Sequence, residues 1–62
     1  MPDRDNTAEN IKTLIKLMEW NRLTDRELNL MESFQKQFDG TNRLSDRQFE
    51  ILNEIFDRAN AR

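Results

Sequence analysis

The sequence predicts an all-α protein, a three-helix domain built on an antiparallel helical hairpin. Helix breakers are nearly absent, because the 62 residues include one Gly and one Pro. Apolar residues recur three and four positions apart along three separate segments. Val, which favours strands, does not occur at all. These three observations predict helices over about residues 7–20, 24–38 and 45–59, in a single domain spanning 7–60.

The first helix is expected to begin near Thr7, after a disordered N-terminus of residues 1–6. Thr7 can serve as its N-cap, and Asn6 or Asp5 would serve as well. A Thr side chain at this position accepts a hydrogen bond from a backbone amide in the first helical turn. The apolar positions that follow share the spacing of one helix face. They are Ile11, Leu14, Ile15 and Met18.

The second helix has a strong start signal at Thr24 and Glu27, three residues apart as in a capping box. Gly40 is expected to end it, because a helix commonly stops at a Gly in the left-handed conformation. The residues expected on its apolar face are Leu28, Met31, Phe34 and Phe38.

The third helix starts with the same pattern, with Ser45 as N-cap and Gln48 three residues later. A short link from the second helix favours antiparallel neighbours, and the first helix is then expected to pack across this hairpin. The apolar stripe of the third helix comprises Phe49, Leu52, Ile55, Phe56 and Ala59.

The two hairpin helices begin with similar sequences. Asn21–Leu28 reads NRLTDREL and Asn42–Phe49 reads NRLSDRQF, an offset of 21 residues. Each segment could independently require a good helix start, or the two could form a true pseudo-repeat with equivalent corners. Both interpretations stay open from the sequence.

Composition excludes several kinds of chemistry. The chain contains no Cys and no His, so thiolate and imidazole metal sites, Cys nucleophiles and His acid–base catalysis are ruled out. Carboxylates such as Asp25 and Asp46 fall in first helical turns, where they complement the helix dipole. No Gly-rich phosphate loop occurs. The chain is therefore expected to have no enzymatic activity, no metal site and no cofactor.

Two further features bear on location. No apolar run is long enough to cross a membrane, and the first residues are acidic and lack the apolar core of a signal peptide. The expectation is a cytoplasmic protein without membrane contact.

Four arginines occupy equivalent places in the two repeated corners and are candidates for nucleic-acid binding through phosphates. The alternative is that each pairs with a nearby carboxylate or stays solvated. The net charge of −2 argues against a dedicated nucleic-acid binder, and antiparallel packing would place the corners a helix length apart. These residues are Arg22, Arg26, Arg43 and Arg47.

A second set of candidates is apolar. Trp20 lies at the end of the first helix, whereas Leu17, Leu30 and Ile51 fall off the main apolar stripes. We expect Trp20, Leu30 and Ile51 to form a partner-binding surface if they are exposed. The alternative is that they complete a small core.

The hairpin segment from Leu23 to Ala59 resembles a known family. The residues that carry the resemblance read Leu-Thr-x-x-Glu with a later Phe, then Leu-Ser-x-x-Gln with a later Leu-x-x-Ile. The segment is similar to small helical-hairpin proteins of phage DNA metabolism, in particular those encoded beside the recombination helicase UvsW of T4-like phages. The family's usual aromatic at the position of Arg26 is absent. The matching residues are Leu23, Thr24, Glu27, Phe34, Leu44, Ser45, Gln48, Leu52, Ile55 and Arg58.

The resemblance implies a non-catalytic accessory module in DNA recombination or repair that binds a helicase or nucleic acid, in the host cytoplasm if phage-encoded. The residues alone are equally consistent with a small adaptor or inhibitor that binds a protein partner without contacting DNA. A monomer and a homodimer are both compatible with a chain of this length.

Overall fold

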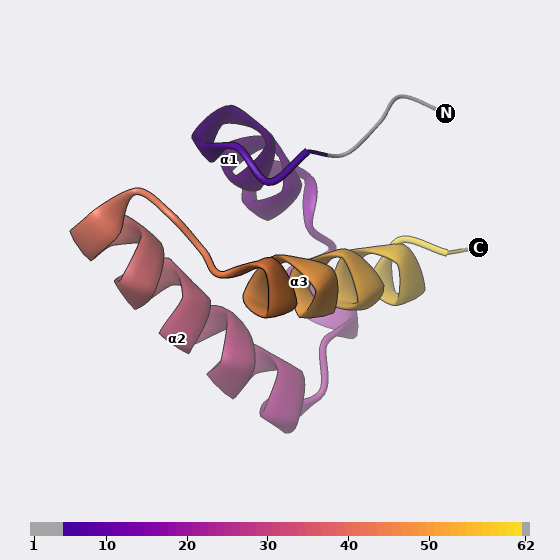
Figure 1. Cartoon of the computed structure of the whole chain (residues 1–62). Coiled ribbons are helices and arrows are strands. Elements are labelled where there is room, and N and C mark those ends of the chain that lie inside the picture. Colours follow the sequence, from indigo (N-terminus) through magenta and orange to yellow (C-terminus); the bar gives the residue numbers. More distant parts are fainter. Residues whose placement is uncertain (1–4, 62) are drawn as a thin grey trace.

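The fold confirms the all-α, three-helix prediction. A computed structural model describes residues 5–61, so the first four residues of the expected disordered N-terminus lie outside the described part. Helix α1 spans Ala8–Leu17, a short 3₁₀ helix η1 spans Trp20–Arg22, α2 spans Asp25–Thr41 and α3 spans Asp46–Ala59 (Figure 1).

Helices α2 and α3 begin at the predicted N-caps, and Thr7 is the one of the three candidate residues that caps α1. The Thr7 hydroxyl accepts from the Asn10 amide at 3.2 Å. At α2 the Thr24 amide donates to Glu27 Oε1 at 2.9 Å, and the Glu27 amide donates back to Thr24 Oγ1 at 3.2 Å. Ser45 and Gln48 form the same reciprocal pair at the start of α3. Both capping boxes are confirmed.

The end of α1 differs from the prediction. The helix stops at Leu17, and the chain is extended at Met18 before Trp20 enters η1. Asn60, near the other end of the chain, contacts the backbone at this point. The Asn60 side chain donates to the Leu17 carbonyl at 3.0 Å and accepts from the Glu19 amide at 3.1 Å. These backbone groups are therefore satisfied outside the helix.

The end of α2 also differs, and the prediction for Gly40 was wrong. Gly40 is helical, α2 continues to Thr41, and Asn42 takes the left-handed conformation with φ 59° and ψ 25°. Asn is the residue after Gly that best tolerates this conformation. The Asn42 amide donates to the Phe38 carbonyl at 2.6 Å, which satisfies one of the last carbonyls of α2.

The core lies between the three helices, and α3 packs against both α1 and α2. Among residues 5–61 no polar or charged side chain is buried. Leu28 was predicted to lie on the apolar face of α2, but it is 38% exposed because it stands at the border of the buried stripe, about 60° around the helix from Met31. The buried residues are Ile11, Leu14, Met18, Met31, Phe34, Phe38, Leu44, Phe49, Leu52, Ile55 and Ala59.

Helices α2 and α3 are joined at one end by a short loop and at the other end by an ion pair. Glu27 in the first turn of α2 binds Arg58 in the last turn of α3. This arrangement is compatible with the predicted antiparallel hairpin, and Figure 1 shows the two helices inclined to each other.

Candidate functional site

Several chain segments meet at the C-terminal end of α3, in a group of polar side chains that we call the latch: Arg22, Glu27, Arg58 and Asn60. Arg22 Nη1 donates to the carbonyls of Ala59 at 3.3 Å and Ala61 at 2.7 Å. A cation near these last carbonyls satisfies their acceptors and complements the helix dipole. The latch therefore fixes the start of α2 against the end of α3.

Arg58, in the last turn of α3, links the same segments by donating back to Glu27 and to the Arg22 carbonyl. Its Nε donates to Glu27 Oε2 at 2.8 Å, and its Nη2 pairs with the second carboxylate oxygen of Glu27. The same guanidinium donates to the Arg22 carbonyl at 3.3 Å. Asn60 completes the latch at the end of α1. Its side chain donates to the Leu17 carbonyl and accepts from the Glu19 amide.

The electrostatics of the latch centre on Glu27. The hydrogen bond from the Thr24 backbone amide lowers the pKa of this carboxyl group below its ordinary value of 4.5, and the Arg58 guanidinium lowers it further. Glu27 is thus held as a carboxylate that serves both the helix cap and the ion pair.

Large apolar side chains flank the latch. Leu17 is 56% exposed and Leu28 is 38% exposed. The Leu17 carbonyl binds Asn60, and Leu28 directly follows Glu27, so both leucines lie at the latch end of the molecule. Trp20 lies on the same connection, half-buried against the core, and its indole N–H donates to the Ile15 carbonyl at 3.3 Å.

The structure thus places the predicted partner-binding residues in two locations. Trp20 lies at the latch end, whereas Leu30 on α2 and Ile51 on α3 belong to the hairpin. Leu30 is 37% exposed, and Ile51 is half-buried against the core. The site prediction omitted Leu17 and Leu28. The exposure of Leu17 could be predicted from the sequence, because Leu17 falls off the apolar stripe of α1. The exposure of Leu28 could not, because Leu28 fits the spacing of the apolar stripe of α2.

The four arginines do not form one basic patch. Arg22 binds carbonyls at the C-terminal end of α3, while Arg47 lies in the first turn of that helix. A 14-residue helix is about 21 Å long, so the two corners lie at opposite ends of α3. Arg26, Arg43 and Arg47 are exposed, whereas the guanidinium of Arg22 is engaged by backbone carbonyls.

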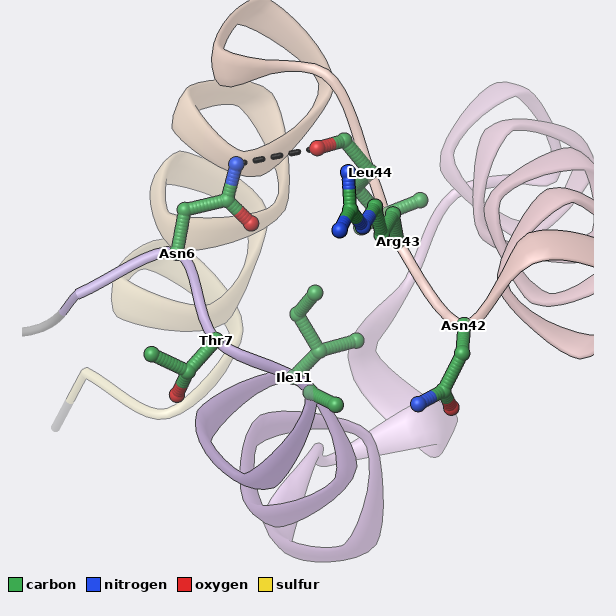
Figure 2. A pocket seen from close by; sticks show the side chains of 7 residues that line it. Asn6, Thr7, Ile11, Asn42, Arg43 and Leu44 are labelled. Carbon is green, nitrogen blue, oxygen red and sulfur yellow. Dashed lines mark hydrogen bonds between the residues drawn. The ribbon is translucent and has the colours of Figure 1, made fainter.

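Away from the latch, a groove of about 500 Å³ runs between the start of α1 and the loop that leads into α3 (Figure 2). Asn6 closes one side, where its amide donates to the Leu44 carbonyl at 2.9 Å and to Asp46 Oδ1 at 3.2 Å. Among the described lining residues, Arg43 is the one with an ionisable side chain. The groove can therefore donate hydrogen bonds to a ligand, and its lining supplies no carboxylate. Its lining residues are Asn6, Thr7, Ala8, Ile11, Asn42, Arg43 and Leu44.

Within 5–61, no group of three or more acidic side chains is placed to hold a metal ion. No helix in that range combines the length and the apolar character that a membrane crossing requires.

Comparison of the chain with protein-family models, with curated proteins and with solved structures finds no match.

Proposed function

We propose that this chain is a non-catalytic module that binds a protein partner through the apolar surface at its latch end, formed by Leu17, Trp20 and Leu28. The observation that carries the proposal is the 56% exposure of Leu17, the most exposed large apolar residue within 5–61. Covering a leucine this exposed removes apolar surface from water, and this burial stabilises the complex with a partner.

The latch supports this role because it makes the surface rigid before a partner arrives. Asn60 holds the backbone of Leu17 and Glu19, and the indole of Trp20 is tied to Ile15. A surface that is already ordered loses less conformational entropy on binding.

The charge distribution favours a protein over nucleic acid as the main partner. Phosphate binding needs several cations on one surface, and here the repeated corners lie at opposite ends of α3. Arg22, moreover, already donates to two carbonyls. The net charge of −2 adds a general repulsion from phosphates.

The class of partner is proposed from the resemblance of the hairpin to phage proteins of DNA metabolism. It suggests a helicase of recombination or repair, with this chain as its accessory. The residues that carry the resemblance are those of α2 and α3, whereas the proposed contact surface also includes the end of α1.

The chain contains a single Trp, which provides a direct reporter. We expect the indole N–H resonance of ¹⁵N-labelled protein to shift or broaden when the unlabelled helicase is added. Leu17→Gln and Leu28→Gln should each weaken the affinity by about tenfold, because each replaces an apolar contact with a polar one. Leu30→Gln is the matched control, since Leu30 is as exposed as Leu28 but lies on a different side of α2, about 160° away around the helix.

Equal weakening by all three substitutions would show that the latch end is not the contact surface. A titration of labelled single-stranded and duplex DNA at two salt concentrations separates the two partner classes. If DNA binding falls steeply with salt and Leu17→Gln does not change it, the nucleic-acid function would replace the proposal.

A further inference from the structure

We propose that the outer face of α3 binds the same face of a second copy of this chain, in an antiparallel arrangement with two-fold symmetry. This inference is independent of the proposed function, because it uses a different surface and needs no other partner.

The first observation is the pattern of charge along α3. Arg47 and Glu54 are seven residues apart, so they lie within about 20° of each other around the helix, two turns apart on one face. Both side chains are exposed, and neither forms an ion pair or hydrogen bond with another described residue. The same face therefore carries an uncommitted cation at one end and an uncommitted anion at the other.

This pattern is self-complementary. When two α3 helices lie antiparallel with the two-fold axis between Glu50 and Ile51, Arg47 of each copy comes opposite Glu54 of the other. One contact is thus made twice, as symmetry requires of a homodimer. A parallel arrangement in the same register would instead place like charges together.

The second observation is the apolar surface beside these charges. Ile51 precedes Arg58 by two turns, so both lie on the side of α3 that faces Glu27 of α2. Leu30 follows Glu27 by one turn on α2. Leu30 and Ile51 therefore line the outer seam between the two helices, the first 37% exposed and the second half-buried.

In the antiparallel pair the two copies of Ile51 meet on the side of the two-fold axis that lies toward α2. Leu30 of each copy lies beside them. Glu50 of each copy lies on the opposite flank, where water solvates it. One flank of the centre is then apolar, the other flank carries the two Glu50 carboxylates, and both ends carry opposite-charge pairs.

An interface of standard size would occupy only part of the surface of this chain. A standard interface covers about 800 Å² of each partner, roughly one sixth of the 4799 Å² that this chain exposes. A single short chain also buries only a modest fraction of its surface, so association adds stability that the monomer cannot supply.

The first test is the mass in solution by light scattering and sedimentation equilibrium, with wild-type protein from micromolar to millimolar concentration. The apparent mass should rise from 7.5 kDa towards twice that value. Arg47→Glu and Glu54→Arg should each weaken dimerisation by about tenfold or more, because each places like charges together twice.

The decisive test mixes the two single variants. Arg47→Glu and Glu54→Arg proteins repel themselves, but together they restore both opposite-charge pairs across the interface. The 1:1 mixture should dimerise like wild type, and so should the double variant. Leu30→Gln should weaken the dimer while Leu28→Gln does not, and circular dichroism checks that every variant is folded.

A mass of 7.5 kDa at millimolar concentration would overturn the proposal. So would single charge variants that dimerise as wild type does, or a mixture that stays monomeric while wild type dimerises.

Discussion

At the scale of single residues, exposure decides which apolar side chains matter for folding. Leu52 and Met31 are completely buried, whereas Leu17 and Leu28 keep a third or more of their surface in water. All four are large apolar residues at helical positions. Their free-energy contributions nonetheless differ severalfold, because only buried methylene groups leave water on folding.

Leu52→Ala is expected to destabilise the protein by about 2–5 kcal/mol, because truncation removes buried contacts and leaves a cavity. Guanidinium unfolding followed by circular dichroism measures the loss. Leu28→Ala is the matched control and should change the free energy of unfolding by less than about 1 kcal/mol. Equal losses in the two variants would contradict the assignment of Leu52 to the core.

Glu27 should make stability depend on pH. Its pKa in the folded state lies below 4.5, so its contribution is fully present above that pH and is lost as pH falls through the folded-state pKa. Glu27→Gln should cost about 0.5–1 kcal/mol at pH 7 and flatten the acid limb of the stability curve.

The Glu27→Gln variant keeps the helix start intact, because Gln48 performs the same capping role at α3 with an amide side chain. The comparison therefore isolates the negative charge of Glu27, which the Thr24 amide and the Arg58 guanidinium both stabilise. Thermal unfolding at several pH values checks it, and an unchanged acid limb would show that other carboxyl groups control the pH dependence.

At the scale of elements, helix starts and helix ends obey different rules. Each start depends on a residue and its partner three positions later, as in Ser45 and Gln48. The ends depend on what the rest of the chain offers to the last carbonyls. For α2 that is the left-handed Asn42, so Gly40 remains an ordinary helical position with open space around it.

Gly40→Ala is therefore expected to stabilise the protein by about 0.5–1 kcal/mol, because Ala loses less backbone entropy in a helix and a Cβ atom here meets nothing within 4 Å. Asn42→Ala should destabilise by about 1–2 kcal/mol, since Ala is strained in the left-handed conformation. Denaturant midpoints of the two variants measure both effects. A destabilised Gly40→Ala protein would indicate that α2 ends at Gly40 after all.

At the scale of the whole molecule, the latch joins the start of α2 and the segment before it to the C-terminal end of α3. Arg22 lies between α1 and α2, and its hydrogen bonds reach the last residues of the described chain. The equivalent arginine of the repeat, Arg43, lines the open groove. Equivalent places in the sequence therefore have different structural roles.

Arg22→Ala should destabilise the protein by about 0.5–1.5 kcal/mol, because two carbonyls lose their donor. Arg43→Ala should leave the free energy of unfolding within about 0.5 kcal/mol of wild type, as an exposed substitution does. Thermal unfolding of both variants side by side provides the check. If the two variants unfold at the same temperature, the hydrogen bonds of Arg22 in the latch do not contribute to stability.

The sequence by itself determined the all-α class, the N-caps of α2 and α3 and most of the core. These features are local, because a capping box and an apolar stripe each involve residues within a few positions of one another. Ile11, Phe34 and Leu52 could be assigned to the core from spacing alone, and all three are buried.

Only the tertiary structure decided where α1 ends, which arginine is engaged, and which leucines face water. These outcomes depend on contacts between distant positions, such as Asn60 with Glu19 across 41 residues and Arg22 with Ala61 across 39. Helical periodicity assigns a residue to a face, but the packing angle of the neighbouring helix decides how much of that face is covered. Leu28 fits the apolar spacing of α2 yet is 38% exposed, because it stands at the border of the stripe that the other helices cover.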